Sequence, residues 1–306
     1  MGDGIMTSKA LVLGGGGPVG IAWESGLLAG FAQAGVNLAD ADFIMGTSAG
    51  SFVGAQLAMG ADPAGLANPF LAMAEAPKAP KPPSPARADP ARPAPDLRRL
   101  MRMMAEAQSG DRPAQQVRAE IGAWALAQDT VGEPEFIQSF GRFLAGLAPD
   151  AWPEKGYACT AVDAETGAFR LWDKAAGVGL AQAVASSCSV PGVYPPISID
   201  GRRYIDGGMR SAVNADMATG YDLVVVIAIR VAMAGEAAER ARQGLEAELQ
   251  VLRDGGARVE LVTPDDASVA AFGLNLMDAR RRPGAAQAGL AQGRAGADAI
   301  RAAWNG

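Results

Sequence analysis

Residues 42–59 read DFIMGTSAGSFVGAQLAM, and this stretch decides the fold. Its first four residues, from Asp42 to Met45, are a short strand candidate, and the residues from Ser51 to Met59 have helical character. The five residues between them, GTSAG, predict a tight turn, because glycine tolerates backbone angles that other residues avoid. A strand, a glycine turn and a helix in direct succession are typical of a parallel sheet covered by helices.

The same order of elements occurs once before, near the start of the sequence. Ala10 to Leu13 is an apolar strand candidate that runs into GGGGPVG, residues 14–20, and a helix is expected from Ile21 to Ala34. Two such units within sixty residues predict an α/β fold with a mostly parallel central sheet. Both glycine turns then lie at the carboxyl edge of that sheet.

The middle of the chain departs from this pattern. Eight prolines fall between Pro77 and Pro95, and such a segment forms neither a helix nor a central strand. The residues that follow, up to about residue 149, are mainly helical in character. We therefore expect residues 1–306 to form a single domain, with residues 63–150 as a helical and proline-rich insertion or cap.

The second half of the chain returns to the α/β pattern. Its buried strands are marked by β-branched apolar runs, which suit a parallel sheet covered on both faces. The expected elements are hairpins at 157–172 and 197–204, a helix at 180–187, a strand at 223–229, a helix at 236–254, a strand at 257–262 and a C-terminal helical region.

Composition and charge exclude several classes of protein. The net charge of −6 argues against a nucleic-acid partner, which needs a basic face. No apolar run approaches the ~18 residues that span a bilayer, and no signal peptide is evident, so we expect a cytoplasmic protein. The two cysteines, Cys159 and Cys188, are expected to be buried free thiols rather than a disulfide framework.

The sequence contains no histidine. A Ser-His-Asp triad, a histidine-ligated metal and a histidine general base are therefore excluded. We expect no metal and no cofactor, so any catalysis depends on other side chains and on backbone groups.

Ser48 is the candidate nucleophile. A serine at the centre of G-x-S-x-G between a strand and a helix is typical of a nucleophile elbow, in which a sharp turn exposes the hydroxyl. Gly46 and Gly50 provide the small neighbours that such a turn requires. The alternative is a structural turn that contains a serine by chance.

The first glycine turn has two interpretations. Residues 15–20 match G-x-G-x-x-G after a strand, which is the pattern of a dinucleotide-binding turn, with Asp40 or Asp42 as the acid that binds the ribose. However, Asp42 opens the second strand, whereas that acid usually follows it. The other interpretation is a nest of backbone N–H groups that binds an oxyanion.

Asp206 is the candidate base for Ser48. It begins Asp206-Gly207-Gly208 at the end of a short extended segment. The structural alternative is a turn aspartate that caps its own backbone. Without histidine, a carboxylate within ~2.6–3.2 Å could accept the serine proton, and burial would help by raising its pKa.

Taken together, these motifs resemble the patatin-like phospholipase family from about Ala10 to Asp216. The resemblance implies a three-layer α/β/α sandwich and a lipid acyl hydrolase with Ser48 as nucleophile and Asp206 as proton acceptor. It also implies that the backbone N–H groups of Gly15, Gly16 and Gly17 form the oxyanion hole, and that the substrate is a lipid or another acyl ester.

Two features lie outside the shared motifs. The family commonly has Lys or Arg where Val19 stands, so the choice between phospholipids and neutral esters stays open. Residues 97–104, LRRLMRMM, are basic and amphipathic, which suits a transient contact with a membrane surface. The alternative for that segment is a solvated helix packed on the domain.

Overall fold

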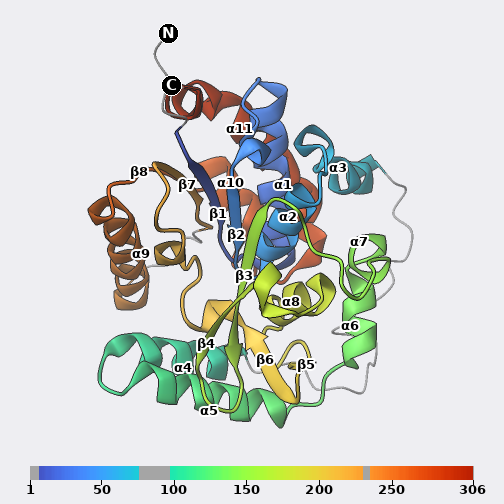
Figure 1. Ribbon diagram of the computed structural model, residues 1–306, viewed down its shortest axis with the longest axis vertical. Helices are drawn as coiled ribbons and strands as arrows, with labels where there is room; N and C mark the ends of the chain where they lie inside the picture. Colours follow the sequence, from blue (N-terminus) through green and yellow to red (C-terminus); the bar gives the residue numbers. More distant parts are fainter. Residues whose placement is uncertain (1–6, 76–96, 230–234, 306) are drawn as a thin grey trace.

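The computed structural model describes residues 7–75, 97–229 and 235–305, and Figure 1 shows the arrangement of its elements. Eight strands form one sheet in the order β5-β6-β3-β2-β1-β7-β8, and β4 pairs with β3 outside this path. The strands are β1 (Lys9–Leu13), β2 (Phe43–Gly46), β3 (Gly156–Asp163), β4 (Phe169–Asp173), β5 (Ile197–Ile199), β6 (Arg202–Asp206), β7 (Leu223–Ile227) and β8 (Arg258–Val262).

The centre of the sheet is parallel. The strands β3, β2, β1, β7 and β8 pair in parallel, whereas β4 and β6 run antiparallel to β3. All five residues of β7 are buried, as its continuous run LVVVI predicts for a strand covered on both faces. The predicted mostly parallel sheet is therefore confirmed.

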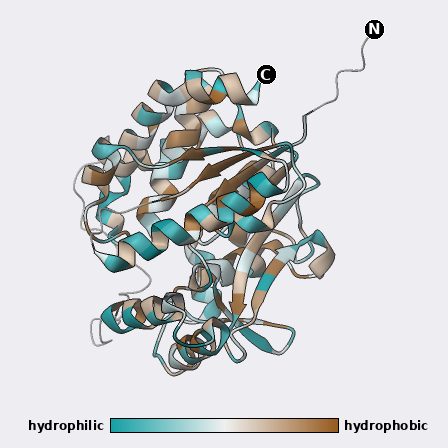
Figure 2. Ribbon diagram, turned by 90° about the vertical axis from the view of Figure 1, so that its left-hand side faces the viewer, coloured by the Kyte–Doolittle hydropathy of each residue, from teal (hydrophilic) through white to brown (hydrophobic). Residues whose placement is uncertain are grey.

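Helices cover both faces of the sheet and complete three layers. One face packs against α1 (Gly17–Gln33), α2 (Ala49–Ala58), α8 (Leu180–Ser187), α10 (Asp266–Phe272) and α11 (Arg282–Trp304). The other face packs against α9 (Glu236–Asp254). Figure 2 shows the apolar strands enclosed between these helices.

The predicted helical region is also present. Its helices are α3 (Asn68–Glu75), α4 (Leu97–Ser109), α5 (Ala114–Leu126), α6 (Glu133–Ser139) and α7 (Arg142–Ala145). Val117 and Ile121 of α5 pack with Val162 and Ile205 of the sheet, so α4 and α5 lie beyond the carboxyl edge of the central strands (Figure 1). The proline-rich stretch expected between Pro77 and Pro95 lies outside the described residues.

The predicted helices and strands occur where the sequence placed them, with small shifts at their ends. The largest shift is in α1, which begins at Gly17 instead of Ile21, because Gly16 is its N-cap and Pro18 fits the first turn of a helix. None of the helices in the described ranges is long and apolar enough to cross a membrane.

Candidate active site

Ser48 lies in a strained turn between β2 and α2. Its φ of +52° and ψ of −115° fall outside the regions that most residues adopt, and it is the N-cap residue of α2. A side chain at Gly46 would collide with the backbone of Gly50, and one at Gly50 would collide with the backbone of Leu13. The turn is therefore a sharp strand-to-helix elbow that tolerates only glycine on both sides.

The glycine turn after β1 lies directly beside this elbow. A Cβ atom at Gly15 would be 3.3 Å from the Cβ of Ser48. The N–H of Gly15 donates to the carbonyl of Ala212 at 2.7 Å, so it is already engaged. In the described part of the chain, the N–H groups of Gly16 and Gly17 have no acceptor. The expected set of three donors is therefore reduced to two.

A third free donor lies in the elbow itself. The N–H of Ala49, the residue after Ser48, also has no acceptor among the described residues. The residue after the nucleophile supplies an oxyanion donor in other hydrolases with such an elbow. Ala49 was not among the three named oxyanion residues, Gly15 to Gly17, but it is the first residue of α2 and belongs to the N-terminal N–H groups that the helix after Ser48 offers to an oxyanion.

Asp206 ends β6 and is buried, with 2% of its surface exposed. Its Oδ1 accepts the N–H of Gly208 at 2.7 Å, which is the turn cap that the structural alternative describes. Its Oδ2 is buried and has no aligned hydrogen-bond donor among the residues that the structure describes. Burial raises the pKa of Asp206 to about 7, and the nearby Ser48 hydroxyl and the Gly208 N–H oppose this shift.

A hydrogen-bond network joins the two turns that carry Ser48 and Asp206. Thr47 Oγ1 lies 2.9 Å from Thr160 Oγ1 on β3, and the side chain of Asn214 donates to Thr47 Oγ1 at 3.1 Å. Asn214 also donates to the carbonyl of Gly207 at 3.4 Å. These bonds hold the residue before Ser48 and the residue after Asp206 in one rigid unit.

The segment after α8 holds the backbone of Ser48. Its N–H donates to Ser187 Oγ at 3.0 Å, and the Cys188 thiol donates to its carbonyl at 3.1 Å. Cys159 and Cys188 are buried free thiols, and burial raises the pKa of Cys159 to about 12. Burial also raises the pKa of Cys188, so its thiol keeps the proton that it donates to the Ser48 carbonyl.

The predicted acid of a dinucleotide site lies at the other edge of the sheet. Asp42 precedes β2, and its carboxylate accepts the N–H of Lys9 at the start of β1 at 2.7 Å. The end of β2 next to the glycine turn is occupied by Thr47 and Ser48. This arrangement favours the oxyanion interpretation of residues 15–20 over the dinucleotide one.

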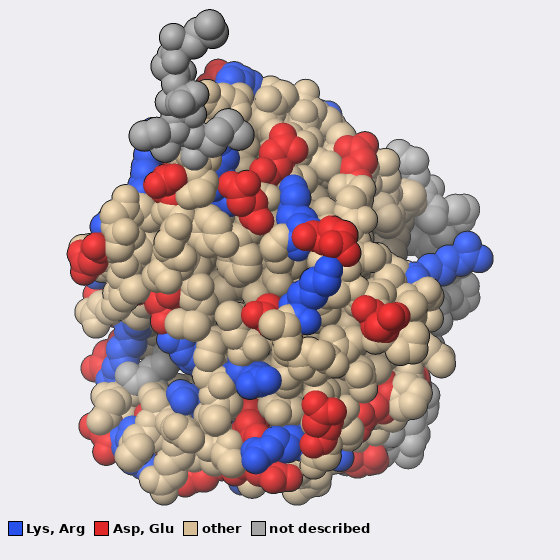
Figure 3. Space-filling view, in the orientation of Figure 1, with Lys and Arg blue, Asp and Glu red and all other residues tan. Residues whose placement is uncertain are grey.

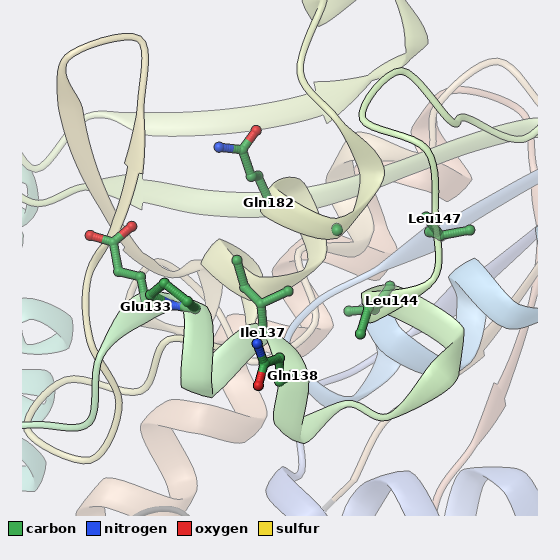
Figure 4. A pocket seen from close by; sticks show the side chains of 9 residues that line it. Glu133, Ile137, Gln138, Leu144, Leu147 and Gln182 are labelled. Carbon is green, nitrogen blue, oxygen red and sulfur yellow. The ribbon is translucent and has the colours of Figure 1, made fainter.

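A surface groove of about 640 Å³ lies between α6, α7 and α8 and is shown in Figure 4. Ile137, Leu144 and Leu147 supply much of its apolar lining, and Glu133 and Gln182 stand at its side. No residue predicted for the candidate active site lines this groove. It is therefore a separate feature of the surface.

Glu24 on α1 is a second buried acid, and over residues 7–75, 97–229 and 235–305 its two carboxyl oxygens have no hydrogen-bond partner. Burial raises the pKa of Glu24 well above its usual value of 4.5. The folded protein therefore binds this proton more tightly than the unfolded chain does. The contribution of Glu24 to the free energy of unfolding is fully present below about pH 4.5. It falls by about 1.4 kcal/mol per pH unit as the pH rises from there toward the pKa of Glu24 in the folded protein.

We predict that Glu24→Gln increases the free energy of unfolding at pH 8 relative to the wild type, since the folded wild type must hold a proton that its unfolded chain releases, and glutamine does not titrate. Urea unfolding of both proteins from pH 5 to pH 8 measures this. Asp206 titrates in both proteins, so its contribution cancels in the difference. A difference that does not grow with pH would contradict the prediction.

Comparisons with known proteins identify one family. The sequence matches the model of the patatin-like phospholipase family over residues 11–219. No curated protein matches the sequence.

Solved structures that match the chain include VipD from Legionella pneumophila, with 15% identity and a TM-score of 0.49. The type III effector protein ExoU matches with 14% identity and a TM-score of 0.39. A human GIVD cytosolic phospholipase A2 in complex with a fluorophosphonate inhibitor matches with 12% identity and a TM-score of 0.37. In the order VipD, ExoU and the phospholipase A2, the alignments cover 96%, 96% and 98% of this chain. They cover 67%, 53% and 60% of the three solved chains.

Proposed function

The chain belongs to the patatin-like phospholipase family, and on that premise we propose that it is a serine hydrolase that cleaves lipid acyl esters through Ser48 and Asp206. One observation carries the proposal. The strained elbow holds Ser48 beside the buried Asp206. Within the described ranges, one oxygen of Asp206 has no partner, and backbone N–H groups next to Ser48 have no acceptor.

In the first step, ionised Asp206 accepts the proton of the Ser48 hydroxyl through Oδ2 while Oγ attacks the ester carbonyl carbon. The carbonyl oxygen gains the negative charge, and the N–H groups of Gly16, Gly17 and Ala49 are the donors available to bind it. When the tetrahedral intermediate collapses, the C–O bond breaks. The leaving alcohol takes the proton from Asp206, and the acyl group stays on Ser48.

In the second step, Asp206 accepts a proton from water, and the resulting hydroxide oxygen attacks the acyl carbon. The intermediate then releases the carboxylic acid, and the proton returns to Ser48. Asp206 thus acts as the only proton carrier, and its raised pKa suits this role, because a base works best when its pKa is near the working pH.

A substrate panel tests the proposed class of reaction. The wild-type protein should release p-nitrophenol from acyl esters and fatty acid from lipid esters in buffer without added cofactor. The competing function is a dinucleotide-binding module that uses residues 15–20. Tight NAD binding by titration calorimetry, together with no esterase activity, would overturn the proposal.

We also propose that residues 97–104 of α4 make a transient contact with a membrane. Leu100 is buried against α5, and the guanidinium of Arg99 lies over the ring of Trp124, so part of the segment packs on the protein. Met101, in contrast, is 49% exposed, and Arg98 and Arg102 are exposed on the same helix. Acidic and basic side chains are mixed over the face shown in Figure 3, so attraction to an anionic membrane has to be local.

We expect Met101→Asp to reduce co-sedimentation of the protein with anionic vesicles several-fold, since it removes an apolar contact and adds a negative charge. Val251→Asp is the matched control, because Val251 on α9 is 46% exposed. Equal vesicle binding by both variants would refute the contact.

A further inference from the structure

A polar segment after β6 bridges the turns that carry Ser48 and Asp206. It comprises residues 210–214, RSAVN, and Asn214 at its end is fully buried. The backbone of Asn214 is left-handed, with φ of +57° and ψ of +35°, a conformation that asparagine and glycine tolerate better than other residues. Few other residues could therefore replace Asn214 without strain.

Arg210 fixes the orientation of the Asn214 amide. Its Nη1 donates to the amide oxygen at 2.8 Å, and a guanidinium has donors but no acceptor, so the oxygen must face it. Arg210 is itself held by both carboxylate oxygens of Asp216 and lies over the ring of Phe169, 4.7 Å from the ring centre. The amide nitrogen of Asn214 consequently points away from Arg210, toward the two turns.

The amide nitrogen of Asn214 contacts both turns at once. It donates to Thr47 Oγ1 at 3.1 Å and to the carbonyl of Gly207 at 3.4 Å. It also donates to the carbonyl of Ser211 at 2.7 Å, which ties the amide to its own segment. Thr47 comes directly before the proposed nucleophile and Gly207 directly after the proposed base, so one buried amide fixes the separation between these two parts of the chain.

Thr160 on β3 strengthens the same link from the side of the sheet. Its Oγ1 lies 2.9 Å from Thr47 Oγ1, and a Cβ atom at Gly207 would lie 2.1 Å from Thr160 Oγ1. Only glycine at position 207 therefore lets the Asp206 turn pack this closely. Thr47, Thr160 and Asn214 are fully buried, so water does not compete for their hydrogen bonds.

We propose that Asn214, oriented by Arg210, is a positioning residue that sets the distance between the Ser48 hydroxyl and the Asp206 carboxylate. This inference rests on the proposed function and adds to it a residue that acts through the two turns and not on the substrate. Proton transfer needs a distance of ~2.6–3.2 Å between the two oxygens, and a misplacement of about 1 Å can lower a rate about 10²-fold. Loss of the amide should therefore slow the proton transfer and leave substrate binding unchanged.

Asn214→Gly tests this inference, because glycine also adopts the left-handed backbone and lacks the amide. We expect kcat for p-nitrophenyl butyrate to fall about 10- to 100-fold with KM unchanged. Thr47→Val removes the hydroxyl that Asn214 contacts and should lower kcat in the same way, whereas Thr47→Ser keeps a hydroxyl and should retain most of the wild-type kcat. Asn37→Gly is the matched control at an exposed turn before β2, and it should leave kcat unchanged.

The same substitution in the Asp206→Asn background separates positioning from damage to the fold. There, Asn214→Gly should lower kcat by at most about 2-fold, because the base that Asn214 positions has already been removed. A smaller folded fraction would instead lower kcat by the same factor in both backgrounds. Equal losses in the two backgrounds would overturn the inference, as would wild-type kcat in both Asn214→Gly and Thr47→Val. Wild-type protein without esterase activity would overturn the proposed function itself.

Discussion

Ser48→Ala is expected to lower kcat for ester hydrolysis by at least about 10³-fold, because the variant keeps the elbow but has no oxygen to attack the ester. Alanine fits the position, since the change removes one oxygen and leaves the Cβ atom in place. Rates on p-nitrophenyl butyrate and on a phospholipid measure the loss.

The control for this variant is a serine outside the site. Ser139→Ala on α6 makes the same chemical change, and Ser139 Oγ only donates to the carbonyl of Phe136. It should keep wild-type turnover, and both variants should keep the wild-type circular dichroism spectrum. If Ser48→Ala retained most of its activity, the assignment of the nucleophile would be wrong.

Asp206→Asn is expected to lower kcat for ester hydrolysis by a similar factor, about 10³-fold or more, because an amide cannot accept the serine proton. The pH profile gives a second test. The base must be ionised, and the pKa of Asp206 is about 7, so kcat/KM of the wild type should rise tenfold per pH unit below pH 7 and level off above it.

The residual activity of Asp206→Asn should lack this dependence. Asp298→Asn is the matched control, because the Asp298 side chain is 92% exposed on α11 and has no part in the proposed site. A wild-type profile that stays flat from pH 5 to pH 8, or an Asp206→Asn variant with near-normal turnover, would contradict the role of Asp206 as the base.

The local parts of this architecture could be predicted from the sequence because they depend on neighbours along the chain. The elbow around Ser48 needs a strand, flanking glycines and a helix, and all of these are contiguous. The buried run at Leu223–Ile227 and the hairpin between β3 and β4 are local patterns of the same kind. The largest shift of an element end, at the start of α1, follows from the cap at Gly16.

The contacts between distant segments could not be predicted in this way. Asn214 joins two turns whose proximity depends on strand order, and a single sequence does not encode that order in a readable pattern. The loss of Gly15 as a free donor follows from its bond to Ala212, nearly two hundred residues away along the chain. Glu24 was not predicted for the same reason, since only packing makes it a buried acid.

A fluorophosphonate probe identifies the nucleophile by direct labelling, because it reacts covalently with a serine activated for acyl transfer. The protein and its Ser48→Ala variant would be treated with the probe, digested and analysed by peptide mass spectrometry. We expect one modified residue, Ser48, and much slower labelling in the Asp206→Asn variant. Absence of label at Ser48 in the wild type would contradict the assignment of Ser48 as nucleophile. Equal labelling of the wild type and the Ser48→Ala variant would contradict it as well.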